Sequence, residues 1–370
     1  MARLPEIDDT LATVARIAGA PTAPYHEHRV MRAIAAELAA RGIDHSRDAY
    51  GQVHAHSRSG DAARSLAFVA HTDHPAFDVV EATGRTGRAR ILGGFYARSF
   101  AREVRVLVCD DATSEPFLAT LDDFVLSANA AHNSVGHCRI RAERDLAIGQ
   151  WAVLDLPAFE RRDDELHLRA ADDLALCAVA ILTLAALRAG GRPHDVRAVF
   201  TRGEETGLYG ARLVAEDGLI PREAIVVSLE ASRALSHARA GGGVVVRPGD
   251  VYNTFSNDGE RFLRVARERL AAERIATQRA LLTGGTCESS AFVRLGWTTT
   301  AIALPNVNYH NQSEDEDRLV PEVVRLSDLR GAVALLVEAA TAAGADEDES
   351  WWPDVRTVPG AIRDLLRRDT

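Results

Sequence analysis

The sequence contains no lysine, so all 43 of its basic residues are arginines. We attribute this exclusive use of arginine to a genomic codon bias rather than to function. Without lysine the chain cannot form the Schiff bases that lysine amines make with carbonyl substrates. It also lacks the lysine with which a P-loop binds phosphate. Two large classes of enzyme chemistry are therefore excluded.

Cysteine is scarce as well, and the four residues present lie far apart without forming a CxxC pair. This spacing is untypical of a disulfide framework or a structural zinc knot. It favours reduced thiols in a cytoplasmic protein. The four residues are Cys109, Cys138, Cys177 and Cys287.

Long apolar runs and positive net charge are also missing. No uninterrupted apolar run reaches about 18 residues, the length that a membrane span requires. The longest candidate, 174–187, is Ala-rich and follows two aspartates, which indicates a buried helix. No export signal is visible at the N-terminus.

The formal net charge of −10 argues against nucleic acid or an anionic membrane as a partner. We expect a cytoplasmic protein that binds neither.

The order of the expected elements predicts one large α/β domain with an inserted module. Hydrophobic residues at 46% and charged residues at 26% are typical of a globular protein. Residues 1–78 and 160–345 alternate helices and strands, which predicts a catalytic domain with a mixed, mostly parallel sheet flanked by helices. Residues 79–159 hold only short β-rich runs, so we expect an inserted small β-barrel-like domain that serves oligomerisation or substrate access.

Apolar periodicity places the main elements of this α/β domain. Strands are expected at 66–70, 196–200, 224–229 and 299–304, and helices at 7–18, 26–41, 174–188, 206–215, 260–273 and 321–341. Residues 346–370 form a tail, in which an acidic linker leads to Trp351, Trp352 and a short amphipathic helix. A tail folded on its own subunit and a contact to another subunit are equally compatible with this pattern.

Two adjacent carboxylates, Glu204 and Glu205, stand directly after the strand expected at 196–200. Such a pair can simply complement a helix dipole. It also suits a metal site, in which one carboxylate binds the cation and its free neighbour takes a proton from a metal-activated water.

Other candidate ligands stand at the ends of further strands, which favours the metal site. His71 ends one strand and forms an HxD pair with Asp73, whose carboxylate can orient the histidine. Asp172 lies where the insert returns to the main domain and can bridge two cations. Glu230 ends another strand, and His310 follows the last one. Each residue alone has an ordinary structural explanation, as a core histidine, a helix cap or a solvated acid. Their joint occurrence at strand ends predicts a centre for two metal ions with open positions for water and substrate.

These residues lie in motifs that resemble a known family. The motifs HTDHPAF, AADDLALCA, TRGEETGLYGA, VSLEAS, GGTCESSAF and YHNQSE are similar, in this order, to those of the di-zinc exopeptidase clan. The insert between His71 and Asp172 makes the sequence most similar to the tetrahedral, deblocking and glutamyl aminopeptidases. The similarity runs from about Thr10 to Ala345 and omits the tail.

The resemblance implies a role for each residue. His71 and Glu230 would be ligands exclusive to one metal or the other, and Asp172 would bridge both metals and precede a cis peptide to Asp173. Glu205 and His310 would complete the ligand set. Glu204 would be the general base, and Asp73 would support His71.

The function implied is hydrolysis of an N-terminal residue from a small peptide substrate by a homo-oligomeric enzyme. Two divalent cations per subunit are expected; zinc is the first expectation, and His and carboxylate ligands accept cobalt and manganese alike. The insert would form dimer contacts, and dimers would assemble into closed shells.

Several positions depart from the aminopeptidase pattern. Leu174 and Leu176 replace a basic residue and a glycine, Cys287 replaces an acidic residue, and Val307 replaces an arginine. Glu230 stands where aspartate is frequent. These departures leave open an N-acyl amino acid deacylase or carboxypeptidase of the same clan, and a catalytically silent scaffold. They also leave the preferred first residue undetermined.

Overall fold

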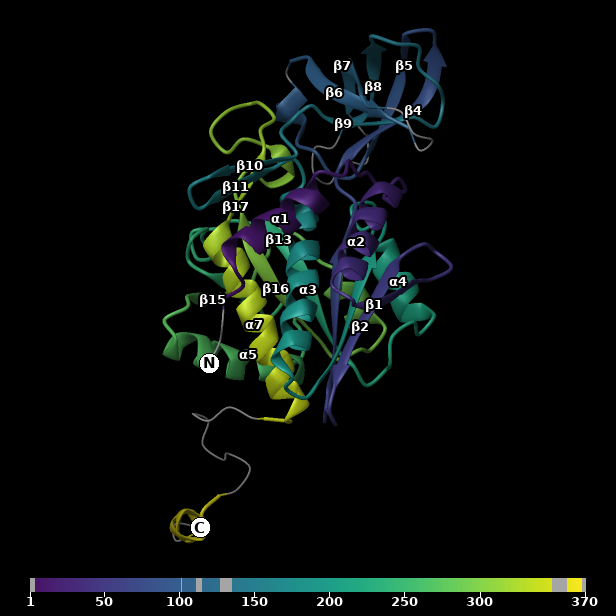
Figure 1. Cartoon of the computed structure of the whole chain (residues 1–370). Coiled ribbons are helices and arrows are strands. Elements are labelled where there is room, and N and C mark those ends of the chain that lie inside the picture. Colours follow the sequence, from purple (N-terminus) through teal and green to yellow (C-terminus); the bar gives the residue numbers. More distant parts are fainter. Residues whose placement is uncertain (1–3, 101, 111–114, 127–134, 348–357, 368–370) are drawn as a thin grey trace.

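The computed structural model describes residues 4–100, 102–110, 115–126, 135–347 and 358–367. An eight-stranded sheet forms the centre of its larger part (Figure 1). The four neighbouring strands β12, β3, β13 and β16 run parallel to one another. In spatial order the strands are β1 (Asp44–Arg47), β2 (Val53–Ser59), β12 (His194–Thr201), β3 (Ser65–His71), β13 (Ile225–Arg233), β16 (Thr299–Asn306), β14 (Val244–Arg247) and β15 (Thr277–Arg279).

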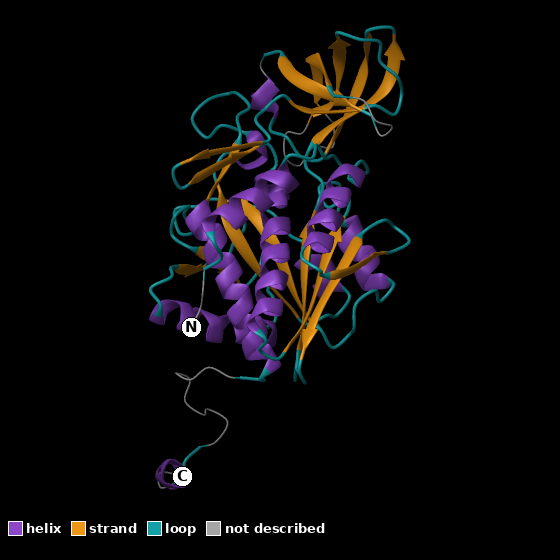
Figure 2. Cartoon of the chain, viewed as in Figure 1, coloured by secondary structure: helices purple, strands orange, loops and turns teal. Residues whose placement is uncertain are grey.

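Helices cover both faces of this sheet, because alternate residues of each strand point to opposite sides. On β3, Leu66 and Phe68 pack into one hydrophobic core, and Ala67 and Val69 pack into another. The first core includes α1 (Ile7–Ala18), α2 (His28–Ala40), α3 (Ala171–Gly190), α5 (Asn257–Ala272) and α7 (Leu326–Gly344), and the second includes α4 (Tyr209–Glu216) and α6 (Ser289–Arg294). The predicted fold class is confirmed (Figure 2).

The insert forms a closed antiparallel barrel at one end of the molecule (Figure 1). Its interior is apolar and includes the stacked rings of Phe77 and Phe95, whose centroids lie 5.3 Å apart. The strands, in their order around the barrel, are β4 (Ala76–Thr83), β5 (Thr86–Leu92), β8 (Val135–Ala142), β7 (Phe117–Leu126), β6 (Val104–Cys109) and β9 (Trp151–Leu154). The short 3₁₀ helix η1 (Ala97–Phe100) connects β5 to β6.

Helix α3 is the central helix of the larger core. Among the described residues it is the one helix that is long and apolar enough to cross a membrane by length and composition, yet 72% of its apolar window is buried inside the protein. It packs against both α1 and α7. A core position explains its apolar composition.

Two expected elements differ from those observed. The helix expected at 321–341 begins only at Leu326, because β17 (Glu322–Arg325) precedes it and pairs with β11 (Glu165–Leu168). Together with β10 (Phe159–Arg162) these strands form a second small sheet. The helix expected from 206 begins at Tyr209, since Gly207 and Leu208 have positive φ angles of 138° and 58°.

The predicted role of Trp351 and Trp352 lies outside the described residues. The tail helix that is described, α8 (Gly360–Leu366), has no buried residue. Neither a contact to the same subunit nor one to another subunit is therefore assigned to it.

The core position of α3 generates a stability prediction. Replacing the fully buried Ile181 by alanine should lower the free energy of unfolding by about 2 to 5 kcal/mol, because the substitution removes buried methyl groups and leaves a cavity. Replacing Ile362 of α8, which is 46% exposed, by alanine should change the free energy of unfolding by less than about 0.5 kcal/mol. Urea unfolding followed by far-ultraviolet circular dichroism measures both. Equal effects would contradict the central position of α3.

Candidate metal centre

The candidate ligands meet at the carboxyl ends of the four parallel strands, where open α/β sheets bind their ligands. His71 is the last residue of β3, and Glu230 lies on the neighbouring β13. Glu204 and Glu205 follow β12, which flanks β3 on its other side. His310 follows β16 in the 3₁₀ helix η2 (Tyr309–Asn311). Residues that are far apart in the sequence are thus neighbours because their strands are neighbours.

Asp172, at the start of α3, stands at the middle of the cluster. Its Oδ1 lies 3.1 Å from Nε2 of His71, which in turn lies 4.0 Å from Oε1 of Glu230. Its Oδ2 lies 3.5 Å from Nε2 of His310, which is 3.5 Å from Oε1 of Glu205. Each oxygen of one carboxylate therefore faces its own histidine and its own glutamate. Both sets of three residues have the proximity that a metal ion requires.

Both histidines are oriented by the nitrogen that points away from the cluster. Nδ1 of His71 lies 3.1 Å from the carbonyl oxygen of Asp73, and Nδ1 of His310 contacts the carbonyl oxygen of Gly94 in the insert. A carbonyl oxygen can only accept, so Nδ1 of each ring carries a proton. Nε2 of each ring is thereby directed at the carboxylates of the cluster, where it could bind a metal in its unprotonated form.

Several atoms of the cluster are buried without a hydrogen-bond partner among the described residues. They are Oε1 of Glu205, Oε2 of Glu230 and Nε2 of His310. Leaving such groups unsatisfied is costly, and native structures rarely do so without a bound ion or water. Carboxylate oxygens and imidazole nitrogens are also a suitable donor set for divalent transition metals. The residues present therefore fit two cations.

Burial and mutual repulsion shift the protonation of these acids. Burial and the charge of Asp172 raise the pKa of both Glu205 and Glu230 well above the ordinary range. Burial alone would raise the pKa of Asp172, but the neighbouring imidazoles of His310 and His71 lower it. A divalent cation bound among these carboxylates would supply the positive charge that favours their ionised forms.

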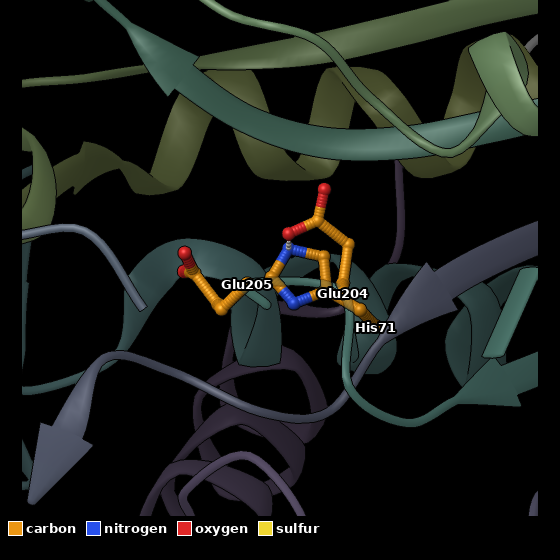
Figure 3. Close-up of side chains that lie close together, drawn as sticks. All are labelled: His71, Glu204 and Glu205. Atoms are coloured by element: carbon orange, nitrogen blue, oxygen red, sulfur yellow. Dashed lines mark ion pairs between the residues drawn. The ribbon is translucent and has the colours of Figure 1, made fainter. Parts of the chain in front are cut away.

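Asp73 positions the glutamate pair. Its Oδ1 accepts a hydrogen bond from the backbone N–H of Glu204, and its Oδ2 accepts one from that of Glu205, each at 3.0 Å. Its carboxylate lies 3.8 Å from Nδ1 of His71, so the carbonyl oxygen of Asp73 makes the closer contact to that ring. Figure 3 shows the resulting arrangement, in which the Glu204 carboxylate faces the imidazole of His71 at 4.0 Å.

Two further buried acids support the site and were missed in the sequence. Oε2 of Glu322 accepts the backbone N–H of Asp172 at 2.9 Å, and its Oε1 accepts that of His310 at 2.8 Å. Glu27 accepts the backbone N–H of Gly203 at 3.0 Å, which fixes the turn before the glutamate pair. Both residues lie outside the motifs. The signal available in the sequence was an acid at the start of an apolar strand or helix, which occurs in most proteins.

The peptide bond between Asp172 and Asp173 is cis, as the resemblance implied. Of the residues that depart from the aminopeptidase pattern, Glu230 belongs to the ligand cluster, whereas Leu174, Leu176 and Cys287 lie outside it. Leu174 and Leu176 are buried within α3, and Cys287 is buried beside the metal centre, where its backbone N–H donates to Asp250. Leu174 and Leu176 offer no metal ligand, and the thiol of Cys287 belongs to none of the candidate ligand groups among the described residues.

Comparison with known proteins identifies one matching family model and several solved structures with a similar fold. The family model that describes M42 glutamyl aminopeptidases matches residues 135–326. An aminopeptidase of the archaeon Desulfurococcus kamchatkensis has a TM-score of 0.74 and 18% identity, and the match covers 95% of this chain and 99% of that one. The TET1 peptidase of Pyrococcus horikoshii has a TM-score of 0.71 and 20% identity over 90% of this chain and 99% of that one.

A TET aminopeptidase from a marine-sediment Thaumarchaeota archaeon is also similar, with a TM-score of 0.74 and 16% identity over 90% of this chain and 96% of that one. At these identities the structural matches establish the fold alone. No curated protein sequence matches the chain.

The two hydrogen bonds of Glu322 generate a prediction about metal affinity. Replacing Glu322 by glutamine should weaken metal binding roughly 10- to 100-fold, because an amide group cannot accept from two backbone N–H groups through both of its ends. Titration with zinc in competition with a chromogenic chelator measures the affinity. Glu314 is exposed, so Glu314→Gln is the matched control and should bind zinc with the affinity of the wild type. Unchanged affinity in Glu322→Gln, with an unchanged melting temperature of the metal-free protein, would contradict this role.

Proposed function

The chain belongs to the M42 glutamyl aminopeptidase family, as its motifs predicted, and from this premise we propose that it removes N-terminal residues from short peptides at a two-metal site. Membership of this family makes it a peptide hydrolase. The observation that carries the two-metal proposal is the position of Asp172, whose two oxygens face two separate pairs of histidine and glutamate.

In this proposal, His71 and Glu230 would hold one cation, His310 and Glu205 would hold the other, and Asp172 would contribute to both sites. When bound, such cations would supply Lewis acidity toward the scissile carbonyl and toward a water molecule. Zinc is the expected metal, and the donor set also accepts cobalt and manganese.

Glu204 is the proposed acid–base residue. Burial raises its pKa to about 8, and the positive charge of His71 acts in the opposite direction. A carboxyl group whose pKa lies near neutral pH can both take the proton of the attacking water and return it to the leaving amine. Asp73 holds the backbone of Glu204 in place, so the carboxylate reaches the site from a fixed loop rather than from a mobile one.

The competing function is hydrolysis of an N-acyl amino acid or of a C-terminal peptide bond, which enzymes of the same clan perform. The same ligands and the same acid–base residue would serve either reaction. The two functions differ in whether the substrate presents a free α-amino group, so substrate structure rather than metal content distinguishes them.

A matched substrate panel tests the proposal. The metal-loaded protein should cleave peptides with a free amino group and leave the same peptides intact when they are N-acetylated. Replacing Glu204 by glutamine should lower kcat by about 100- to 10,000-fold, because proton transfer is lost while the size of the side chain is kept. Liquid chromatography of the products measures both effects.

The metal content of Glu204→Gln should match that of the wild type, which separates lost proton transfer from lost metal. Cleavage of only the acetylated set would move the assignment to the deacylase or carboxypeptidase. No cleavage of either set by fully metal-loaded protein would favour a catalytically silent scaffold.

We also propose that the protein is a homo-oligomer in which the barrel makes contacts between subunits. The TET1 peptidase of Pyrococcus horikoshii can assemble into a tetrahedron or a large octahedral shell, and this chain covers 99% of its length. Light scattering coupled to gel filtration should give a mass that is a multiple of the 40.0 kDa chain. A monomer across the micromolar concentration range would contradict the proposal.

A further inference from the structure

A small cavity lies where the barrel joins the larger domain (Figure 1). Its lining includes Val153 and Leu154 of the barrel strand β9, and Ala20 and Thr22 of the segment between α1 and α2. The loops behind the metal centre complete the lining, which we call the junction cavity. Their residues are His74, Pro75, Arg169, Ala170 and Asn311.

The junction cavity has room for one small ion or molecule. The volume that the centre of a water molecule can reach is about 10 Å³, within an empty space of about 250 Å³ that includes solvent at its mouth. About 10 to 15 Å³ of such volume is what one bound water needs. The cavity is therefore too small for a peptide or a nucleotide.

Arg169 brings a buried positive charge to this cavity, with 8% of the residue exposed. Its guanidinium forms no hydrogen bond or ion pair with any residue that the structure describes. No side-chain nitrogen of Arg169 is completely enclosed, so a small solute can reach it. Arg247, which is also buried, differs because its Nη1 donates a hydrogen bond to the hydroxyl of Ser232 at 3.0 Å.

The lining of the junction cavity supplies no anion for Arg169, since it contains neither aspartate nor glutamate. Burial lowers the pKa of Arg169, and Cys109 and Asp155 act in the opposite direction. The carboxylate of Asp155, however, already forms an ion pair with Arg105 at 2.8 Å. A buried charge without a counterion is costly, because nothing replaces the hydration that it loses.

The other polar side chains of the lining make hydrogen bonds within the protein. The hydroxyl of Thr22 and Nδ2 of Asn311 each donate to a carbonyl oxygen. Nδ1 of His74 lies 2.6 Å from the carbonyl oxygen of Asp172. Arg169 is therefore the residue of this lining that offers unused donors, and a guanidinium has five N–H groups.

We propose that Arg169 binds one small monovalent anion, of the size of chloride, in the junction cavity. Such an ion would neutralise the guanidinium, which a water molecule in the same space cannot do. The barrel, the segment before α2 and the loops of His74 and Asn311 would then pack around a neutral pair. The proposal goes beyond the peptidase reaction, because it concerns how the barrel is held against the larger domain.

Thermal unfolding in matched salts tests the proposal. Replacing gluconate by chloride at roughly 0.1 M should raise the melting temperature of the wild type by about 1 to 3 °C, because chloride binds the folded state alone. Arg169→Met should respond by less than about 0.5 °C, because it lacks the guanidinium that holds the ion. Arg169→Lys should keep part of the response, since it retains the positive charge.

Arg162→Met is the matched control. Arg162 lies on β10, forms an exposed ion pair with Glu160 at 2.9 Å and does not line the cavity, so this variant should respond to chloride as the wild type does. General salt effects, and chloride bound at a metal, would appear in Arg169→Met as well. An equal chloride response in the wild type and Arg169→Met, or none in the wild type, would overturn the proposal.

Diffraction locates the ion directly. Crystals of the wild type grown in bromide should give an anomalous peak beside the guanidinium of Arg169, and Arg169→Met should give none there. The absence of this peak from the wild type would overturn the proposal even if Arg169→Met does not fold. A peak without any chloride response in solution would mark binding at crystal concentration only and would also overturn it. Neither measurement reads peptide hydrolysis, so failure of the proposed function would leave this test intact.

Discussion

The crowding of buried acids around two histidines is the constraint on which the rest of the structure depends. The carboxylates of Asp172, Glu204, Glu205 and Glu230 each lie within 4.0 Å of His71 or His310, and burial strengthens the repulsion among them. Such a cluster is favourable only where positive charge compensates it, which two divalent cations would supply. The fold must hold these side chains together against that repulsion.

The surrounding structure meets this constraint with two further acids, whose carboxylates accept hydrogen bonds from the backbone of the site. Asp73 and Glu322 each accept two backbone N–H groups of residues at the site. The side chains of Glu204, Glu205, Asp172 and His310 are thus positioned through their own main chain.

The barrel contributes to the site as well as to the outline of the molecule. The carbonyl of Gly94 orients His310, and the ring and hydroxyl of Tyr96 contact the guanidinium of Arg233 on β13. Gly94 and Tyr96 belong to the segment between β5 and β6. A change in how the barrel sits on the main domain would therefore alter the orientation of His310, which connects the predicted role of the barrel in assembly to the chemistry of the site.

Strand periodicity and the motifs at strand ends were enough to predict the α/β fold, the inserted barrel and the family. They also identified seven residues that the structure brings into one cluster: His71, Asp73, Asp172, Glu204, Glu205, Glu230 and His310. This succeeded because the carboxyl ends of parallel strands share one edge of a sheet, so a local pattern carries spatial information.

Tertiary structure alone decided which residues outside the motifs support the site. Glu322 could not be recognised, because β17 pairs with a strand about 150 residues away and its sequence continues into a helix. The burial of Arg247 was equally hidden, since a sequence shows which charges are present but only packing decides which of them are buried.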